Sequence, residues 1–498
     1  MNKDQAETGK LQSLLSKIGE GLDQFVKFEH PDAFQSKQQW LKDLDIPLPQ
    51  KGIGIEQVTQ ELLSTVMVNG SPVGNPGFSS FITTGATTAS TLATTAASIA
   101  SPQRYLGTAF NFLEELSLLW MAEMFGISHM KGVYSSGGSV ANLIALGGAR
   151  QSAFEKIGID PAADGVDRPS SIYASKECHH TIQRSGGVLG IGRRAIKPID
   201  CDNLGRMRID SLLAAIEKDE RDEILPIAIV ANAGTTNTGA IDPLLEIGKI
   251  AHKKQIWFHV DGAYGLPGIL DERIKYLYDG LKYADSVIVD PHKWLGASVG
   301  VAATFVKDRD YLLRAFTQEP ADYLEGSASQ AEIDQAENST THSVSAKIEH
   351  SLDDFGIPYF DYGVELSAPC RGVVVWAMLK EIGVEGMTER VKRHNNMARY
   401  IAEFSDNHPN LETLLNPTLS ICCFRYVDEK ITDLDKFNQR LHRCLVRENK
   451  FMPSTTKVNG KLAIRPCYVG ARHEQTQVDD LLAEILRIGK QLVEGINR

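Results

Sequence analysis

Two polar residues stand at the ends of apolar segments and have side chains suited to covalent catalysis. Lys293 follows the apolar run 286–289 and an Asp-Pro-His turn, and Asp261 ends the apolar run 256–260. Both runs are short and rich in β-branched residues, which is typical of buried strands. A lysine just beyond a strand is poorly placed for packing, whereas an amine held beside a cofactor is a good nucleophile. We therefore expect Lys293 to be a covalent catalyst.

A lysine and a carboxylate at neighbouring strand ends are what a pyridoxal phosphate enzyme requires. The lysine amine forms a Schiff base with the aldehyde of the cofactor. The carboxylate keeps the pyridine nitrogen protonated, so that the ring withdraws electrons from the α-carbon of the substrate. The alternatives are a surface lysine and a turn aspartate, since Asp261-Gly262 is a common turn sequence. Ala263 is small enough for the cofactor ring to lie flat against it.

Two further segments predict contacts to the phosphate and the ring. The sequence Ser-Ser-Gly-Gly-Ser at 135–139 precedes a helical pattern. Glycines allow close backbone approach, and a helix N-terminus attracts an anion, so Gly138 and Ser139 are predicted to bind the phosphate. An N-capping serine is the alternative. Thr236 follows another apolar run, and its hydroxyl is expected to contact the cofactor unless the segment is a plain turn.

His179 follows the apolar run 172–174, and its imidazole could stack on the cofactor ring. A structural histidine or a metal ligand is the alternative. The chain has no HExxH motif and no third ligand at metal spacing, so we expect no metal. The glycine-rich segment 187–192 lacks the spacing of a dinucleotide-binding loop.

These residues need a scaffold that brings strand ends together. Between residues 132 and 306, short apolar runs alternate with helical patterns, which predicts an α/β domain with a mainly parallel sheet. In such sheets ligands bind beyond the carboxyl ends of the strands. Strands are expected at 133–134, 172–174, 227–231, 256–260 and 286–289, and helices over 139–150, from 181 onward and over 243–253.

The whole chain is predicted to divide into an N-terminal helical segment (1–85), a large domain (86–370) and a small α+β domain (371–498). Leucines and isoleucines between 11 and 22 recur at helical spacing. Such a face usually packs into a core, and a dimerisation arm is the alternative. The stretch 71–101 is rich in small residues but retains large apolar ones, so we expect order there. The long polar stretch 324–358 suggests a closing lid.

Composition excludes several other classes of protein. The chain has 498 residues and a net charge of −11, which argues against nucleic acid as the main partner. Seven cysteines without CxxC spacing favour a reducing, cytoplasmic location over a disulfide framework. The N-terminus is too polar for a secretory signal, and no apolar run is long enough to span a bilayer, so no membrane association is expected.

Together the motifs resemble the group II pyridoxal-dependent decarboxylases, which include aromatic amino acid, histidine, glutamate, cysteine sulfinate and diaminobutyrate decarboxylases. The resemblance covers about residues 72–482. It implies an aminotransferase-like (fold type I) homodimer with active sites at the interface, converting an L-amino acid into the amine and CO2. It rests on the motifs Ser136-Gly-Gly-Ser-Val-Ala-Asn142, His179, Gly234-Thr-Thr236, His259-Val-Asp-Gly-Ala-Tyr264, Asp290-Pro-His-Lys-Trp294 and Leu462-Ala-Ile-Arg-Pro466.

The resemblance also implies a role for each matching residue. Lys293 corresponds to the Schiff-base lysine, Asp261 to the partner of the ring nitrogen, and His179 to the stacking residue. Tyr323 corresponds to a mobile-loop tyrosine that returns a proton to the α-carbon. Further cofactor contacts are implied for Gly138, Ser139, Thr236, Ala263, Asp290 and His292, and substrate contacts for Thr83, His179 and Arg371.

Two alternative functions remain open. One is different pyridoxal phosphate chemistry on the same scaffold, such as carbon–carbon lyase chemistry or decarboxylation linked to transamination or oxidative deamination. Tyr323 favours simple decarboxylation over these reactions. The other is a non-catalytic pyridoxal phosphate-binding scaffold, which the retention of both Lys293 and Asp261 disfavours. The motifs do not discriminate among L-amino acid substrates.

Overall fold

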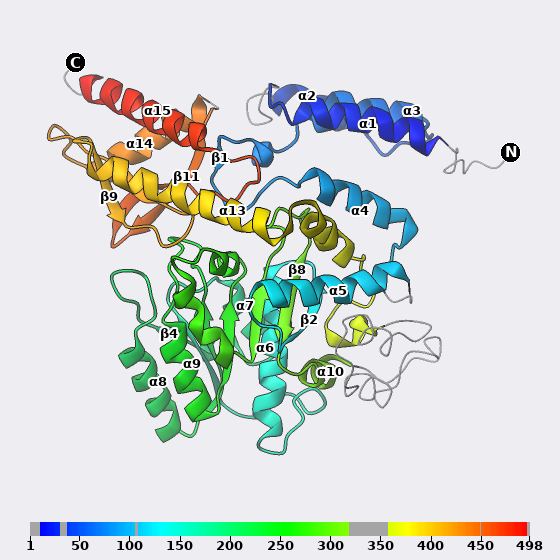
Figure 1. Cartoon of the computed structure of the whole chain (residues 1–498), viewed down its shortest axis with the longest axis vertical. Helices are drawn as coiled ribbons and strands as arrows, with labels where there is room; N and C mark the ends of the chain where they lie inside the picture. Colours follow the sequence, from blue (N-terminus) through cyan, green and yellow to red (C-terminus); the bar gives the residue numbers. More distant parts are fainter. Residues whose placement is uncertain (1–9, 30–36, 105–107, 318–356, 449, 496–498) are drawn as a thin grey trace.

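A seven-stranded sheet forms the centre of the larger part of the molecule. The computed structural model describes residues 10–29, 37–104, 108–317, 357–448 and 450–495. The strand order is β2-β8-β7-β6-β5-β3-β4. Figure 1 labels β2 and β8 at one end of this order and β4 at the other. The strands are β2 (Lys131–Ser135), β3 (Ser170–Ser175), β4 (Ile196–Ile199), β5 (Leu225–Asn232), β6 (Trp257–Asp261), β7 (Ser286–Val289) and β8 (Ala302–Val306).

The sheet is mainly parallel, as the alternating pattern predicts. β7, β6, β5, β3 and β4 pair in parallel, and β8 is antiparallel to both β7 and β2. β2 therefore runs in the same direction as β7, and its carboxyl end lies at the same edge of the sheet. The sequence patterns predicted neither β8 nor β4, and the apolar character of β4 is interrupted by Lys197 and Pro198.

Helices surround this sheet and fix the segments that follow the strands. α6 crosses the sheet and contacts β2, β5, β6, β7 and β8. Ala141 and Ala145 lie one turn apart on α6 and pack with Ala263, Ile288 and Ala302, so small side chains let the helix approach the strands closely. The helices are α6 (Gly138–Glu155), α7 (Thr181–Val188), α8 (Ile209–Arg221), α9 (Leu244–Lys254) and α10 (Asp310–Phe316), with a 3₁₀ segment η5 (Lys275–Tyr283).

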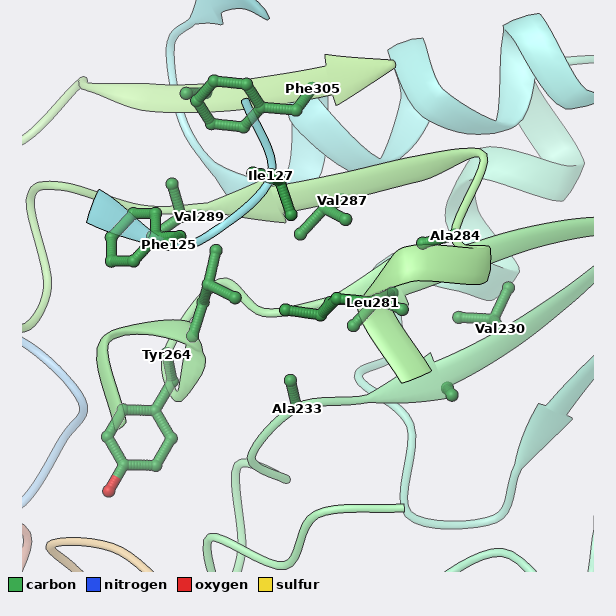
Figure 2. Close-up of a cluster of buried hydrophobic side chains, with 14 of the residues drawn as sticks. Phe125, Ile127, Val230, Ala233, Tyr264, Leu281, Ala284, Val287, Val289 and Phe305 are labelled. Carbon is green, nitrogen blue, oxygen red and sulfur yellow. The ribbon is translucent and has the colours of Figure 1, made fainter. Parts of the chain in front are cut away.

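The main hydrophobic core lies against the central strands. Figure 2 shows Val287 and Val289 of β7 near Phe125 and Ile127, which follow α5 (Ala109–Met124). All four side chains are inaccessible to solvent. Figure 2 also shows the Tyr264 ring with its hydroxyl directed away from the cluster, where it hydrogen-bonds Ser420 Oγ at 2.7 Å. The core therefore anchors β7, the strand that leads to Lys293.

A second, five-stranded sheet belongs to the C-terminal part and has the order β1-β11-β12-β10-β9. Its strands are β1 (Phe78–Ser79), β9 (Leu411–Leu415), β10 (Cys423–Tyr426), β11 (Met452–Val458) and β12 (Lys461–Arg465), and its helices are α13 (Gly372–Asp406), α14 (Leu434–Arg447) and α15 (Gln475–Glu494). α13 bends at Gly383, which has φ of 64°. β1 pairs in parallel with β11, so the N-terminal segment contributes a strand to the C-terminal sheet. The three-part division at residues 85 and 370 stays a prediction.

The N-terminal helices do not enter the core of this chain. α1 (Leu11–Phe25) has no buried residue, and it contacts α3 (Ile55–Glu61) and the π-helical segment η1 (Leu62–Met67). α2 spans Lys37–Leu44. Figure 1 shows these helices grouped together near the N-terminus, and α4 (Thr88–Ala100) follows them in the chain. The expectation that the apolar face of α1 packs into the core is therefore wrong.

The expected order between residues 71 and 101 is confirmed, because α4 forms there and a Cβ on Gly85 would lie 2.7 Å from the Gly74 Cα. Within the described ranges, no helix is long and apolar enough to cross a membrane. Tyr323 and nearly all of the predicted lid, 324–358, lie outside the described residues.

Candidate active site

The carboxyl ends of the parallel strands open into one cavity of about 290 Å³, close to the lower end of the range for ligand pockets. Its walls come from the segments that follow β2, β3, β5, β6 and β7. Every residue predicted to bind the cofactor lies in this wall. The lining residues are Ser136, Gly137, Gly138, Ser139, Asn142, His179, Thr181, Asn232, Gly234, Thr236, Asp261, Ala263, Tyr264, Asp290, His292 and Lys293.

Lys293 lies in a turn just beyond β7 and keeps its amine at the cavity. Its Nζ is 3.0 Å from Asp290 Oδ2, and its backbone N–H donates to the Asp290 carbonyl at 2.9 Å. The His292 ring is held separately, because its Nδ1–H donates to the Val301 carbonyl at 2.6 Å. The Trp294 indole is buried, stacks on Tyr264 and donates to His394 Nδ1 at 2.9 Å. The residues on both sides of Lys293 are therefore fixed while its side chain stays accessible.

Asp261 is the last residue of β6, which pairs directly with β7. Parallel pairing places Asp261 opposite Ile288, so the carboxylate and the turn carrying Lys293 share one edge of the sheet. Asp261 Oδ1 accepts the Ala263 N–H at 3.1 Å, and Oδ2 accepts a hydrogen bond from Asn142 Nδ2, also at 3.1 Å. Each oxygen has a second lone pair, so the buried carboxylate can still accept from a ligand in the cavity.

His179 reaches the same cavity from the segment between β3 and α7. Its Nδ1 accepts the Thr181 backbone N–H at 3.4 Å and lies 2.9 Å from Thr181 Oγ1. Burial lowers the pKa of His179, and the charge of Asp261 partly opposes that effect. A neutral ring that accepts at Nδ1 carries its proton on Nε2. The imidazole is therefore oriented by the backbone of α7 and is free to stack on a flat ligand.

Thr236 belongs to a turn that is tied to the C-terminal sheet. Arg465 of β12 donates to the carbonyls of Thr236 and Asn237, and its Nη1 also donates to the Ser80 carbonyl at 3.0 Å. One guanidinium thus joins the cavity wall, the small sheet and the segment that leads to Thr83. Arginine suits this position because its donors form a rigid fork.

Thr83 and Arg371, predicted to contact substrate, do not line the described cavity. Arg371 is buried and pairs with both carboxylate oxygens of Glu365 at 3.0 and 3.1 Å, while its Nε donates to the Gly300 carbonyl at 2.8 Å. Its charge and donors are thus already engaged within the chain. The sequence around Arg371 could not reveal this pairing, because Glu365 is itself brought close only by the fold.

A family model described as the pyridoxal-dependent decarboxylase conserved domain matches residues 38–427. The chain belongs to the pyridoxal-dependent decarboxylase family. The predicted cofactor, pyridoxal phosphate, and the predicted class of enzyme, a carboxy-lyase, are confirmed.

Individual relatives agree with this membership. An aromatic-L-amino-acid decarboxylase of Bacillus atrophaeus is 29% identical over 396 residues, covering 78% of this chain and 75% of the relative. A human cysteine sulfinic acid decarboxylase is 25% identical over 468 residues, covering 90% and 89%. The crystal structure of an Oryza sativa protein, TDC with pyridoxal phosphate and tryptamine, superposes with a TM-score of 0.85 at 21% identity, over 98% of this chain and 99% of that one. The predicted fold type I architecture is confirmed.

The residues of this decarboxylase fit the cofactor of the family. The first N–H groups of a helix have no intrahelical acceptor, and those of α6 lie beside Gly138 and Ser139, in reach of a phosphate. Asp290 Oδ1 is buried and has no hydrogen-bond partner among the described residues, so this wall contains an unused acceptor. Gly138 lets the start of the helix approach this aspartate closely, because a Cβ at this position would lie 2.6 Å from Asp290 Oδ2.

We predict that Gly138→Ala weakens cofactor binding without unfolding the protein. The new Cβ would lie 2.6 Å from Asp290 Oδ2, so the aspartate that pairs with Lys293 must move. Overpacking of this kind costs about 1–3 kcal/mol, which corresponds to an affinity loss of about fivefold to 150-fold. Fluorescence titration of the apoprotein with pyridoxal phosphate measures it. Gly187→Ala on α7 is the matched control, since its Cβ would meet Arg193 at an ordinary 3.5 Å; equal affinities of the two variants would contradict the prediction.

Several lining residues were not predicted to have a role. Asn142 lies one helical turn after Gly138 on α6, and this i, i+4 spacing could have indicated that it shares the same face. Asn232 is the last residue of β5. The argument that singled out Asp261, a polar residue at the end of an apolar strand, could also have predicted Asn232. Thr181 is two residues beyond His179, and no sequence signal distinguishes it from an ordinary helix-start residue.

Proposed function

We propose that this enzyme removes the α-carboxylate of an L-amino acid as CO2 and releases the corresponding amine. The observation that carries the proposal is the convergence of Lys293, Asp261 and His179 on one cavity at the carboxyl edge of the sheet. Family membership supports the reaction class. The relatives named for aromatic amino acids and for cysteine sulfinic acid differ in substrate, so the screen described below decides among side chains.

Each residue has a separate task in this proposal. Pyridoxal phosphate, when bound, supplies the electron sink that accepts the bonding pair as CO2 leaves. Lys293 would hold the cofactor through its side-chain amine. Asp261 would accept a hydrogen bond from the protonated ring nitrogen, and His179 would stack on the ring. Gly138, Ser139, Thr236, Ala263, Asp290 and His292 complete the cofactor-binding wall.

The reaction also needs a proton at the α-carbon to replace the lost carboxylate. We assign this proton to Tyr323, which lies outside the described residues, on the strength of the family resemblance. The balance is one amino acid and one proton converted into one amine and one CO2. Thr83 and Arg371 remain proposed substrate-side residues, with Arg371 acting through its pairing with Glu365 rather than as a free cation.

A substrate screen tests the proposed reaction. The purified holoenzyme is incubated with each common L-amino acid, with cysteine sulfinate and with diaminobutyrate, and CO2 and amine are measured together. Equimolar CO2 and amine from at least one substrate is the expected result. Aldehyde with ammonia in place of amine would assign the oxidative alternative. A protein that shows no cofactor absorption after incubation with pyridoxal phosphate would refute the proposal, and one that absorbs but turns over no substrate would assign the non-catalytic scaffold.

The enzyme is further proposed to be a homodimer in the cytoplasm. Large apolar side chains are exposed on α1 and α4, among them Leu11, Leu15, Leu92 and Ile99, with Leu92 at 65% and Ile99 at 67%. Exposed apolar surface of this kind usually belongs to an interface, and a second copy is the occupant that the family resemblance implies. All seven cysteines are free thiols, which suits a reducing compartment.

We predict that the double variant Leu92→Glu, Ile99→Glu dissociates this dimer. Each buried glutamate without a partner would cost several kcal/mol, which is a large part of the free energy that holds a typical dimer together. Light scattering coupled to size exclusion should show the mass of one chain instead of two. Tyr276→Glu, at a position on η5 that is equally exposed (67%), is the control and should keep the wild-type mass. A monomeric wild-type protein at micromolar concentration would contradict the proposal.

A further inference from the structure

A buried amide on α6 hydrogen-bonds Asp261 directly and reaches His179 through Thr181, and these are the two groups that would face the cofactor ring. Asn142 is almost fully buried and lines the cavity. Its Nδ2 donates to Asp261 Oδ2 at 3.1 Å and to Thr181 Oγ1 at 3.2 Å, and its Oδ1 accepts from His259 Nε2 at 2.8 Å. Both amide hydrogens and one lone pair of the amide oxygen are therefore used inside the protein.

The orientation of this amide is determined by a series of buried hydrogen-bonded groups that starts at Trp257. His259 and Ser286 are both fully buried, on adjacent strands β6 and β7, and Ser286 Oγ lies 2.8 Å from His259 Nδ1. Ser286 Oγ also accepts the indole N–H of Trp257 at 2.8 Å. Burial lowers the pKa of His259 to about 4, so the ring is neutral near pH 7 and has one N–H.

The direction of each hydrogen bond in this series follows from the Asp261 carboxylate, which is the last acceptor. A carboxylate only accepts, so Asn142 must present its NH2 group to Asp261 and its oxygen to His259. His259 then carries its proton on Nε2 and accepts at Nδ1. The Ser286 hydroxyl must therefore donate to Nδ1, and its oxygen accepts from Trp257. Every hydrogen bond from Trp257 to Asp261 points the same way, and such chains strengthen each member.

The second hydrogen of the Asn142 NH2 group extends the arrangement to His179. Thr181 Oγ1 accepts this hydrogen, so its own hydroxyl proton is available for His179 Nδ1 at 2.9 Å. The Thr181 backbone N–H also points to Nδ1. One amide thus holds the Asp261 carboxylate and, through Thr181, sets the tautomer of the His179 imidazole.

From these contacts we infer that Asn142 is a positioning residue for catalysis, oriented by Trp257, Ser286 and His259, which fixes Asp261 and His179 together for cofactor binding. The inference deepens the proposed function and rests on it for the roles of Asp261 and His179. Removing the amide donor leaves Asp261 Oδ2 without its partner and lets the His179 ring change tautomer. Replacing a residue that has a merely structural role would change neither the hydrogen bonding of Asp261 nor the tautomer of His179.

The test compares two isosteric changes at matched positions. Asn395 is also fully buried, and its Nδ2 donates to the buried Asp271 Oδ2 at 3.0 Å, but it does not line the cavity. Asn142→Asp and Asn395→Asp therefore each replace a buried amide donor by a carboxylic acid beside a buried carboxylate. The apoprotein melting temperature, the dissociation constant of pyridoxal phosphate and the pH dependence of its visible absorption are measured for both variants.

We expect both variants to lose apoprotein stability, whereas Asn142→Asp alone raises the dissociation constant of pyridoxal phosphate, by about tenfold to a hundredfold. The pH at which the visible band of the bound cofactor changes should also shift in this variant and stay unchanged in Asn395→Asp. Equal cofactor affinities and equal pH profiles in the two variants would overturn the inference. Should Asn142→Asp fail to fold, the His259 pair described next provides the same test.

The His259 variants test whether the series of hydrogen bonds through Ser286 and His259 orients the Asn142 amide. Gln at position 259 can still donate to Asn142 Oδ1, so His259→Gln should bind pyridoxal phosphate within about threefold of wild type, whereas His259→Leu should lose about tenfold. Equal affinities of these two would overturn the inference. Failure of wild-type protein to bind the cofactor at Lys293 would instead refute the proposed function, so the two failures are distinguishable.

Discussion

Lys293→Ala is expected to abolish amine production, lowering kcat by more than about 10³-fold, because a covalent catalyst is removed. Lys293 is the one lysine among the described residues that line the cavity, so no neighbouring amine replaces it. The variant should keep its fold, since the side chain makes an ion pair with Asp290 and is partly exposed (24%). Its loss leaves the buried Asp290 with His292 Nε2, 3.7 Å away, as its remaining ionisable neighbour, so some loss of stability is expected beside the loss of activity.

Borohydride reduction of the holoenzyme, followed by peptide mass spectrometry, checks the attachment point directly. Wild-type protein should carry the reduced cofactor on the peptide that contains residue 293, and Lys293→Ala should carry none. Lys307→Ala is the matched control, because Lys307 also pairs with an aspartate, Asp285, at 3.1 Å but lies outside the cavity. Near-normal CO2 release by Lys293→Ala, or a tag on another lysine, would remove the basis of the proposed function.

Asp261→Asn is expected to lower kcat by about 10²-fold or more, because an amide cannot hold the pyridine nitrogen in its protonated form. The surroundings make the change more severe. Both carboxylate oxygens accept N–H groups, from Ala263 and from Asn142, so the new NH2 group must face a donor in either orientation. A buried donor without an acceptor costs about 1–3 kcal/mol, and cofactor affinity should fall as well.

Steady-state kinetics and ¹⁵N NMR of labelled pyridoxal phosphate measure the two consequences separately. The ring nitrogen should be protonated in wild type and unprotonated in Asp261→Asn. Asp271→Asn is a useful control, because Asp271 is likewise buried and accepts from an asparagine, Asn395, away from the cavity. It should lose stability but retain kcat. A kcat of Asp261→Asn close to that of wild type would show that the acid is not needed.

Local patterns were enough to predict the strands and helices around the cavity. The apolar runs before Asp261 and Lys293 are buried on both faces of the sheet, so they appear as continuous apolar segments that end abruptly at a polar residue. β4 escaped notice because it is an edge strand with a lysine and a proline, and an edge strand needs less apolar character. The helix of residues 11–22 was predicted, but not its exposure, because periodicity shows that a face is apolar without showing what covers it.

The sequence by itself determined which chemistry is possible here, since the identities of Lys293, Asp261 and His179 and their places after apolar strands follow from residue type and short-range spacing. The tertiary structure alone decided which of these residues meet and what holds them. The order β7-β6-β5-β3 sets the neighbours at the edge of the sheet, and contacts more than a hundred residues apart join Asn142 to Asp261 and His259. It likewise engaged Arg371 with Glu365. Hydrogen bonds form according to distance in space, and only the packed chain brings such distant residues within reach.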